Sequence, residues 1–568
     1  MDRRRDHRVR PPPDLLAAPS DTVPAGIAVG LALQHLSVQA VYLLLPLAVA
    51  RALDLDAVAT VQFLSLTLLA MAVTTALHTM SRGPIGSGYP LSCIPAPVAM
   101  SSYVGLAAFS LTPGQAAPSI ILAGLGGLAL VLLLPGLLRR LPVEVAGVVS
   151  FVLGMSLLPV AAEMGLRSPA DPWVSGFAVL VLLGIVVANV ANWRFASFGL
   201  LLGGGVGSVI ALAAWTPASA ILAELWEQPL FSPPQLAFPP VTEFRLDVTL
   251  AFLVISVGLL PGVLANVLTL QRLGNADWLK PDPGPLQRSF VATSLGLVSA
   301  GALGGMVATT SAGGVGLTAA TRLMSRRIIW VNLAILVGLA CSPWLIGHLL
   351  LLPAPVSAAM LLFIACFMLG SGVQQIAGRV LDKRRTCVVG LGLSAAFLDL
   401  LAREHLAALL PAALLGPVTL GFLVSLGVHV LTLPLVTRRT EAVITLDESA
   451  PRALDRFVTA SAGAFGLRRA TAEAAGHAAI EVGEILAARG VAQLEAEMRV
   501  ADNRVRLLLR HAGAPLPRPA RDPKAHDVAA GEDDAREAFA MWLAAREADA
   551  CVPRALPQGS QLVLEFSE

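Results

Sequence analysis

Long apolar stretches without charged residues recur between the N-terminal tail and Arg438, and they limit what this chain can fold into. Each is about 20 residues long, the length at which a helix spans the hydrocarbon of a bilayer. Hydrocarbon offers no partner to backbone N–H and C=O groups, so such stretches must be helical. Only 14% of the 568 residues are charged, below the quarter or so that is usual in soluble proteins. We therefore expect an all-α polytopic membrane protein.

Fourteen spans are expected when the apolar runs are divided at charged, Pro, Gly and Asn connectors. Seven precede and seven follow a polar connector at residues 216–243, which we expect outside the cytoplasm. The expected spans start near Ala25, Val58, Ile94, Pro118, Val143, Trp173, Phe195, Val248, Phe290, Thr309, Ile328, Ala354, Cys387 and Leu415.

Lys and Arg residues lie in every second connector, and this alternation predicts the orientation of the spans. The N-terminal tail, residues 1–23, is basic and lacks the pattern of a removable signal peptide, so we expect it to stay in the cytoplasm. Both termini of a multi-pass protein of the cytoplasmic (inner) membrane then lie on the inner side. The basic connectors contain Arg82, Arg139, Arg140, Arg194, Arg272, Lys280, Arg288, Arg322, Arg326, Arg327, Arg379, Lys383, Arg384, Arg385, Arg438 and Arg439.

An odd number of spans in each half inserts residues 24–215 and residues 244–438 in opposite directions, as an inverted repeat. In both halves the third span is interrupted by Gly, Pro and small hydroxyl residues, at residues 83–97 and 308–316. Broken helices at matching positions indicate a solute site near mid-bilayer, where free N–H groups and positive dipole ends face the solute. The alternative, in which these glycines serve only packing and connection, stays open.

Three segments resemble the nucleobase/ascorbate transporter family, the xanthine and uracil permeases. Span one contains Gln34-His35, similar to the Gln-His pair of the family's first helix. Span ten contains Gly316 followed by Thr321-Arg322, similar to the family pattern Gln/Glu-Asn-x-Gly-x4-Thr-Arg. Residues 271–283 resemble the connector that follows the family's eighth span. The resemblance covers roughly residues 24–438.

This resemblance implies a secondary active transporter, not an enzyme, for a nucleobase-like heterocycle of the xanthine, urate or uracil class. The family fold has seven plus seven spans, divided into a core domain and a gate domain that move relative to each other around a site between spans three and ten. The family also suggests a homodimer. Carried over to this chain, the substrate-binding positions are Gln34, His35, Ala96, Pro97, Gly262, Asn266, Ser311, Ala312, Gly313, Gly314 and Thr318.

The chain departs from the family where the family carries acidic and polar side chains. Gly313-Gly314 stand in place of Gln/Glu-Asn in span ten, and span eight lacks the usual Glu. No acidic residue lies between Asp282 and Asp382. This loss counts against proton or sodium coupling through spans eight and ten, and no other cofactor is expected. The remaining donors, mostly backbone N–H groups and hydroxyls, favour a neutral or anionic solute.

Ionisable residues inside apolar spans are costly, so each is a functional candidate. His35, His429 and Asp399 lie deepest in the expected spans. His35 either titrates during transport or stays neutral and hydrogen-bonded between helices. Asp399 is followed four residues later by Arg403, a spacing that favours a structural ion pair. Nearer the span ends lie Glu144 and Glu163.

The charged composition after Arg439 predicts a cytoplasmic α/β sandwich domain over residues 439–568. Its patterns predict strands at residues 441–446, 494–500, 505–510 and 562–566, and helices at residues 450–465, 469–489 and 534–548. This order resembles the histidine-kinase-type ATPase fold of anti-sigma-factor kinases. However, Ala488 and His511 replace the Asn that binds magnesium and the Asp that binds adenine in that family. The resemblance implies a degenerate domain that dimerises or binds a cytoplasmic regulatory partner.

Other classes of function receive less support from the composition. The net charge is +2 and the basic residues are dispersed, which does not favour nucleic-acid binding. The five cysteines lack the spacing of a metal site, and we infer neither a metal nor disulfides. The expected partners are the lipid bilayer and a small-molecule solute. Two alternatives to nucleobase transport stay open: an anion transporter of the sulfate-permease type, and a transport-derived membrane sensor that signals through the C-terminal domain.

Overall fold

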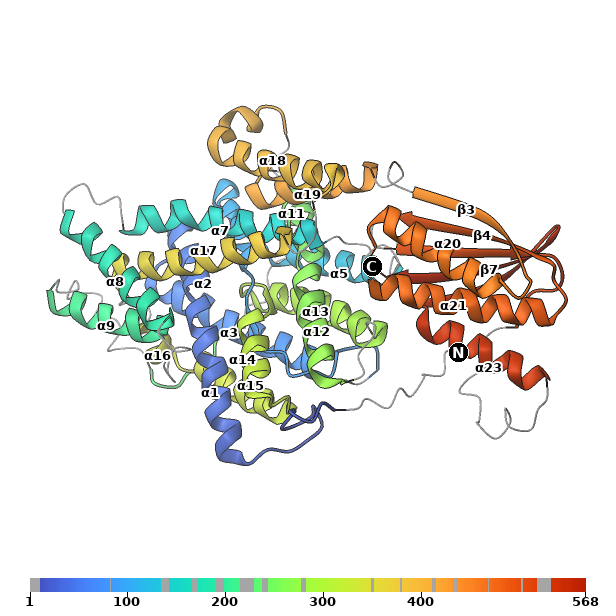
Figure 1. Cartoon of the computed structure of the whole chain (residues 1–568). Helices are drawn as coiled ribbons and strands as arrows, with labels where there is room; N and C mark the ends of the chain where they lie inside the picture. The colour runs from blue at the N-terminus through green and yellow to red at the C-terminus, as the bar shows by residue number, and fades with distance from the viewer. Residues whose placement is uncertain are drawn as a thin grey trace. The chain divides into compact units, whose positions relative to one another are not determined.

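The chain divides into two compact units, one that ends at Val428 and one that begins at His429. The first unit is helical, and the second combines helices with a β-sheet (Figure 1). The computed structural model describes residues 11–81, 83–133, 143–165, 172–190, 199–214, 229–236, 244–276, 282–348, 352–377, 381–410, 415–432, 435, 438–467, 469–501, 504–517 and 533–567.

In the first half of the first unit, helices alternate with short connectors, and one strand interrupts them. The elements are α1 (Ala25–Tyr42), α2 (Leu44–Ala52), α3 (Ala57–Thr79), β1 (Cys93–Pro95), η1 (Pro97–Ala99), α4 (Met100–Val104), η2 (Gly105–Phe109), α5 (Ala117–Leu133), α7 (Val143–Gly165), α8 (Pro172–Val190) and α9 (Gly199–Ala214).

The second half of this unit repeats that pattern. Its elements are α11 (Leu246–Gly258), α12 (Leu260–Gly274), α13 (Pro283–Leu303), β2 (Ala308–Thr310), α14 (Ala312–Thr321), α15 (Arg326–Ala340), α16 (Pro343–Gly347), α17 (Ala354–Ala377), α18 (Lys383–Ala407) and α19 (Pro417–Thr432).

Seven helices or helix pairs of the described residues are long and apolar enough to cross a membrane. They are Ala25–Ala52, Ala57–Thr79, Glu144–Ala162, Trp173–Val190, Leu246–Gly274, Ala354–Ala377 and Lys383–Ala407. The described residues also include shorter apolar helices of 10–17 residues, Ala117–Leu133 and Pro417–Thr432 among these. Both interrupted spans expected from the sequence are a short strand followed by short helices, β1 with η1 and α4, and β2 with α14.

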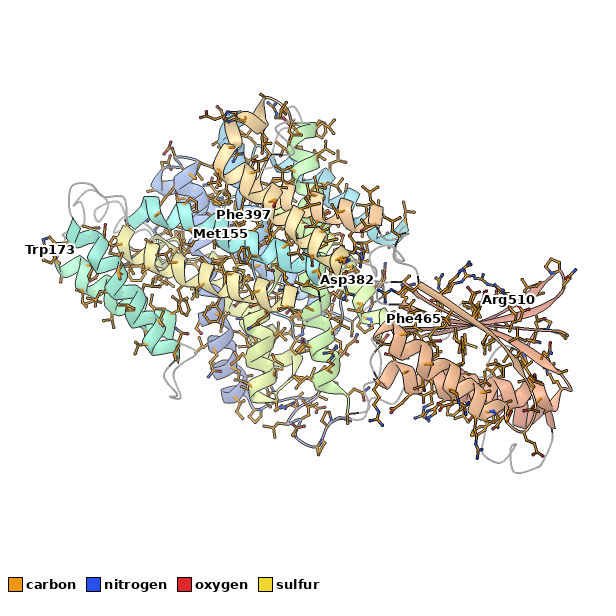
Figure 2. All side chains as sticks on the ribbon, turned by 45° about the horizontal axis from the view of Figure 1, so that its top comes forward. Met155, Trp173, Asp382, Phe397, Phe465 and Arg510 are labelled. Atoms are coloured by element: carbon orange, nitrogen blue, oxygen red, sulfur yellow. The ribbon has the colours of Figure 1, made fainter. Side chains whose placement is uncertain are left out.

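Carboxylates at helix starts define where several spans begin. The Asp56 side chain accepts a hydrogen bond from the Ala59 backbone N–H (2.7 Å) at the start of α3. Asp382 does the same for the Arg385 N–H (2.8 Å) at the start of α18 (Figure 2). A carboxylate there satisfies backbone donors that lack a partner in the helix and complements the helix dipole.

Glycines let the helices α7 and α17 lie side by side along their length (Figure 1). A Cβ atom on Gly147 would lie 2.7 Å from Ile376, and one on Gly372 would lie 2.6 Å from the Phe151 backbone. On the neighbouring helix α18, Phe397 packs edge-on against Phe151, with ring centroids 6.4 Å apart. Close packing through small residues is the usual way in which helices associate in lipid, where burial of apolar surface gives no net gain.

The second unit contains one five-stranded antiparallel sheet in the order β3-β4-β5-β7-β6. The core lies between one face of this sheet and the helices, and Figure 1 shows α20 and α21 lying along it. The elements are β3 (Arg438–Thr445), α20 (Ala450–Phe465), α21 (Arg469–Ala488), β4 (Gln493–Ala501), β5 (Arg504–His511), α23 (Asp533–Glu547), β6 (Ala550–Leu556) and β7 (Gly559–Ser567).

Strand β6 was not expected from the sequence, because Pro553 interrupts its pattern. Proline cannot donate to a sheet ladder and is tolerated on an edge strand. β6 is such an edge, paired on one side with β7. His511 is buried at the end of β5.

Candidate functional site

Strands β1 and β2 bring the two interrupted spans together in the interior of the first unit. They pair antiparallel, with Cys93 opposite Thr310 and Pro95 opposite Ala308. All three residues of β1 are buried, and so are the two ends of β2. Each strand runs directly into a helix start, Pro97 of η1 and Ala312 of α14. The starts of two helices, one from each half of the chain, therefore lie close together.

Buried hydroxyl groups and backbone carbonyls satisfy the extended backbone around this strand pair. The Ala96 N–H donates to the Val307 carbonyl (2.7 Å), and the Ser311 N–H donates to the Ser92 carbonyl (2.9 Å). The Cys93 N–H donates to Thr75 Oγ1 (3.1 Å) on α3. Because buried backbone groups rarely stay unpaired, these bonds determine where the two short strands lie.

Helix α1 supplies polar side chains to the same place. His35 is buried, and its Nδ1 lies 3.1 Å from Ser92 Oγ. One turn later, Gln39 is also buried and donates to the Cys93 carbonyl (2.8 Å). Asn332 of α15 donates to Gln39 Oε1 (2.8 Å). The side-chain amides of Asn332 and Gln39 therefore connect α15 and α1 to β1 through consecutive hydrogen bonds.

Of the predicted Gln34-His35 pair, only His35 contacts the segment leading into β1. Gln34 is half-buried, and the amide that bonds to the strand belongs to Gln39. Sequence reasoning missed Gln39 and Asn332. A signal for both was present, because each is an amide in an otherwise apolar span, where a polar side chain must find a partner.

Two of the predicted positions in span eight, Gly262 and Asn266, differ in their surroundings. Asn266 is buried and donates to Thr310 Oγ1 (2.9 Å) and to the Thr310 carbonyl (3.2 Å), so it supports β2. Gly262 is exposed, and a Cβ atom there would meet nothing within 4 Å. The structure therefore joins Asn266, but not Gly262, to the strand pair.

The start of α14 packs against α1 with no room for a side chain. A Cβ atom on Gly314 would lie 2.2 Å from Ser92 Oγ and 3.1 Å from His35 Nδ1. One on Gly313 would lie 2.9 Å from Val38. The Gln/Glu-Asn pair of the family pattern therefore cannot occupy these positions without a shift of α1.

Both hydroxyls predicted for solute binding in span ten bond to their own helix. Ser311 Oγ accepts from the Gly314 N–H (3.0 Å). Thr318 Oγ1 donates to the Gly314 carbonyl (3.0 Å). Ala312, next to Ser311, is exposed. The backbone of α14, more than its side chains, is what this span offers to a solute.

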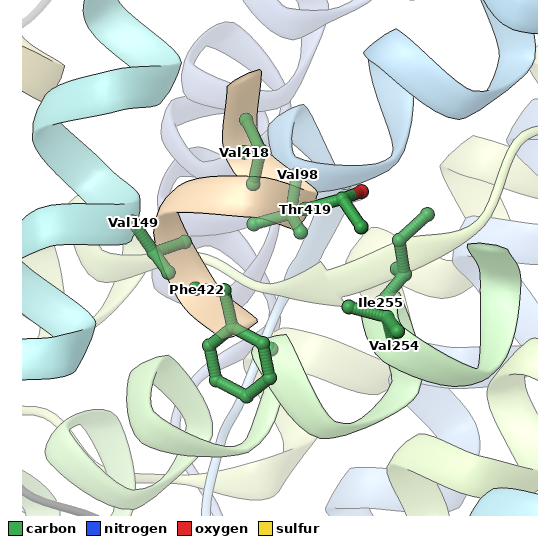
Figure 3. A pocket seen from close by; sticks show the side chains of 8 residues that line it. Val98, Val149, Val254, Ile255, Val418, Thr419 and Phe422 are labelled. Atoms are coloured by element: carbon green, nitrogen blue, oxygen red, sulfur yellow. The ribbon is translucent and has the colours of Figure 1, made fainter. Parts of the chain in front are cut away.

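A small cavity lies next to Val98, the residue after Pro97, where the first interrupted span approaches the helices α7, α11 and α19 (Figure 3). Its volume is about 10 Å³, enough for one water molecule. Among its lining side chains, the Thr419 hydroxyl is the single polar group. The lining residues are Val98, Val149, Val254, Ile255, Gly258, Val418, Thr419 and Phe422.

A second cavity of about 310 Å³ lies between α1, α2, α9 and α17. Its two polar side chains already have backbone partners in their own helices. Ser208 Oγ donates to the Gly204 carbonyl (2.7 Å), and His348 Nδ1 lies 2.6 Å from the Trp344 carbonyl. The cavity has the size of a small-ligand site but offers no converging polar groups to orient a heterocycle.

The ionisable side chains buried in the first unit differ in how they are paired. Glu144 forms an ion pair with Arg385 (3.1 Å). Arg403 acts on the Asp399 carboxyl group electrostatically, but both Asp399 oxygens are buried and have no partner with hydrogen-bond geometry among the described residues. His429 is also buried, and the side chain of Glu163 lies outside the described residues. In the part of the chain that the structure describes, no three His, Cys, Asp or Glu side chains cluster as a metal site would.

The arginines of the span-ten motif tie the N-terminal tail to the end of α14. Arg322 pairs with Asp14 (3.1 Å). Arg326 donates to the Pro19 carbonyl (2.9 Å) and to Ser81 Oγ (3.0 Å). At this end of span ten, the arginines of the family motif therefore attach the N-terminal tail to the helices and do not face the strand pair.

The chain is similar in sequence to known permeases. A family model for xanthine and uracil permeases, described as the Permease family, matches residues 26–400. The uric acid permease PucJ of Bacillus subtilis is 24% identical over 389 residues, which cover 64% of this chain and 84% of PucJ.

Solved structures of anion transporters have a similar fold. Murine Slc26a9 in the inward-facing state has a TM-score of 0.52 at 12% identity and covers 75% of this chain and 71% of its own. A second SLC26A9 structure has a TM-score of 0.51 at 11% identity and covers 74% and 67%. At such low identity this likeness concerns the fold alone.

Proposed function

Since the chain belongs to the Permease family of xanthine and uracil transporters, we propose that it carries a nucleobase-like heterocycle across the cytoplasmic membrane. The solute class is xanthine, urate or uracil. The observation that carries this proposal is the β1–β2 pair, from which two short helices start at one buried place. Helix starts of this kind offer N–H donors to the carbonyl groups or the negative charge of a solute.

The transport unit in this proposal consists of fourteen spans arranged as two inverted repeats of seven, with both termini in the cytoplasm. Helices α7, α17, α18 and α19 belong to the gate, and β1, β2, α1 and α14 belong to the core. The cavity beside Val98 holds only one water molecule, whereas a heterocycle needs far more room. Core and gate must therefore separate at this cavity for a solute to enter.

The side chains beside this cavity favour a flat, weakly charged solute. Its lining is mostly Val, Ile and Phe, which suits the faces of a heterocycle. Hydrogen bonds to the edges of the ring must then come from the backbone of η1 and α14, because Ser311 and Thr318 already bond within α14. Because residues 248–276 of span eight and the whole of span ten contain no acidic residue, a neutral or anionic base is preferred over a cation.

Uptake of radiolabelled solutes into proteoliposomes that contain the full chain tests this function. The probes are uric acid, xanthine, uracil and sulfate, each with and without a pH gradient. Saturable uptake of one of the first three, in competition with the other bases, supports the proposal. Saturable sulfate uptake without nucleobase uptake would instead support the anion-transporter alternative, which the fold likeness to Slc26a9 leaves open.

The position of the site is tested separately by Gly313→Trp. Gly313 contacts Val38 of α1, so an indole there should block the start of α14 and abolish uptake. Gly316→Trp is the matched control, because Gly316 is exposed and has open space around it. Equal uptake by both variants would show that the solute site does not lie at the start of α14.

The C-terminal unit has a regulatory role in this proposal, either by dimerisation or by binding a cytoplasmic partner. Ala488, on α21, stands where the ATPase fold that this unit resembles has the Asn that binds magnesium. If the unit reports solute binding and the helical unit transports nothing, binding of uric acid to the purified protein without flux will reveal the sensor alternative.

A further inference from the structure

Asp399, in α18, is a buried carboxyl group that the nucleobase site does not use. Its exposed fraction is 1%, and neither of its oxygens has a partner with hydrogen-bond geometry among the described residues. The other buried acid in the described helices of the first unit, Glu144, has Arg385 as its partner. Because an unpaired buried carboxylate is costly, and more so in a membrane, Asp399 calls for an explanation beyond packing.

The side chains packed beside Asp399 are largely apolar, and Arg403, one turn later on α18, is the charged side chain that acts on its carboxyl group electrostatically. Ala396, one turn earlier on α18, packs with Val152 and Val418 in one buried cluster. Helix α18 also leaves helical geometry at Ala402, three residues after Asp399 (φ −136°, ψ 37°). An ionised carboxylate gains little in such a place, so the geometry favours a carboxyl that holds a proton in the conformation described.

The carboxyl group also lies next to the start of a gate helix that lines the small cavity. The backbone N–H of Gly416, which directly precedes α19, acts on it electrostatically. Val418 and Thr419, in the first turn of α19, line the cavity opposite Val98 of the interrupted third span. A movement of α19 away from Val98 would therefore change the surroundings of Asp399 and the space beside the solute site together.

Two other carboxylates on the helices near Asp399 already have partners. Glu144 on α7 is paired with Arg385, and Asp247 on α11 is paired with Arg245 (3.1 Å). His429 stands near the other end of α19. The described charged groups and histidines on the elements packed around Asp399 are Lys383, Arg384, Arg385, Arg403, Glu404 and His405 on α18, Glu144 on α7, Asp247 on α11 and His429 on α19.

We propose that Asp399 is the proton-coupling residue of this transporter and that it performs in the gate the function for which residues 248–276 of span eight and the whole of span ten have no carboxylate. One oxygen of its carboxylate binds a proton when the gate opens to the acidic side. The same proton leaves to water when α19 moves and the carboxyl group is hydrated from the other side. This proposal rests on the proposed nucleobase transport.

The test compares wild type with Asp399→Asn in proteoliposomes, with radiolabelled uric acid, xanthine and uracil as probes. The amide resembles a protonated carboxyl that cannot release its proton. Asp399→Asn should therefore lose uptake driven by an inward proton gradient and keep counterflow exchange at equal pH. Glu404→Gln removes an exposed carboxylate from the same helix and should behave as wild type.

Other outcomes separate the possibilities. Gradient-driven uptake by Asp399→Asn at the wild-type level would overturn the proposal. If this variant loses exchange as well, Asp399→Glu decides: restored gradient-driven uptake supports a titrating carboxyl, and continued loss assigns Asp399 a purely structural role and overturns the proposal.

A readout without solute distinguishes failure of this proposal from failure of nucleobase transport. Infrared difference spectra of the reconstituted protein between acidic and alkaline pH should contain a carboxylic-acid C=O band that is absent from Asp399→Asn and present in Glu404→Gln. If wild type transports none of the probes but has this band, the nucleobase assignment fails and the protonation of Asp399 stands. If wild type and Asp399→Asn have identical spectra, Asp399 does not titrate and the proposal is wrong.

Discussion

Replacing Gly314 by alanine puts a methyl group into the contact between α14 and α1. The new Cβ would lie 2.2 Å from Ser92 Oγ and 3.1 Å from His35 Nδ1. The first distance is far below van der Waals contact, so Ser92 must rotate or α14 must move. Rotation of Ser92 breaks its contact with His35 (3.1 Å), which is buried and has no water to replace the lost partner.

The expected cost follows from these two effects. Overpacking of this kind costs about 1–3 kcal/mol, and a buried group left without its hydrogen bond costs about 1–3 kcal/mol. The gain from alanine in a helix is about 0.5–1 kcal/mol. We therefore expect Gly314→Ala to destabilise the helical unit by about 2 kcal/mol or more, which for a unit of this size corresponds to a fall in Tm of roughly 2 °C or more.

The assay is thermal unfolding of the detergent-purified chain, combined with uptake of the solute identified in proteoliposomes. Gly316→Ala is the matched control: it lies on the same helix, has nothing within 4 Å of its Cβ position, and should raise Tm slightly. Ser92→Ala removes the clashing oxygen. The double variant Ser92→Ala with Gly314→Ala should therefore be no less stable than Ser92→Ala alone, a departure from additivity that a direct contact predicts.

Equal Tm values for Gly314→Ala and Gly316→Ala would refute this reasoning, because they would mean that α14 does not approach α1 as closely as described. Additive losses in the double variant would also contradict it, since they would locate the strain elsewhere than at Ser92.

Three further predictions concern other contacts. Tyr103→Phe removes a buried hydroxyl that donates to the Gly305 carbonyl (2.9 Å) and accepts from the Val307 N–H (3.2 Å). It should therefore lower the free energy of unfolding by about 1–3 kcal/mol, measured as a fall in Tm. Arg326→Ala should expose the N-terminal tail, because the guanidinium bonds to the Pro19 carbonyl (2.9 Å); faster hydrogen exchange of the tail peptides checks this. In the second unit, a hydrogen bond from Arg499 holds the pKa of Glu497 below its usual value of 4.5. The stability from this pair is present above pH 4.5 and is lost as pH falls through the lowered pKa. The protection of the β4 amides against hydrogen exchange, relative to their intrinsic rates, should therefore fall more steeply towards acidic pH in wild type than in Glu497→Gln.

The amino-acid sequence alone determined the class of protein and much of its local structure. An uncharged apolar run of membrane length has one stable backbone conformation in hydrocarbon, so the helices could be predicted without knowledge of their neighbours. The interruptions before Pro97 and at Ser311 could be predicted for the same local reason, since proline and glycine-rich segments do not continue a helix.

Only the tertiary structure decided which polar side chains are satisfied and by what. The bond from Asn332 to Gln39 joins residues 293 positions apart, and the contact of His35 with Ser92 joins residues 57 apart. Asp399 illustrates the limit most clearly: its spacing from Arg403 favoured an ion pair along the helix, but the fold buries the carboxyl group so that, among the described residues, neither oxygen has a hydrogen-bond partner. Periodicity and composition are short-range, whereas hydrogen bonds between helices depend on which faces pack together, and that is a property of the whole fold.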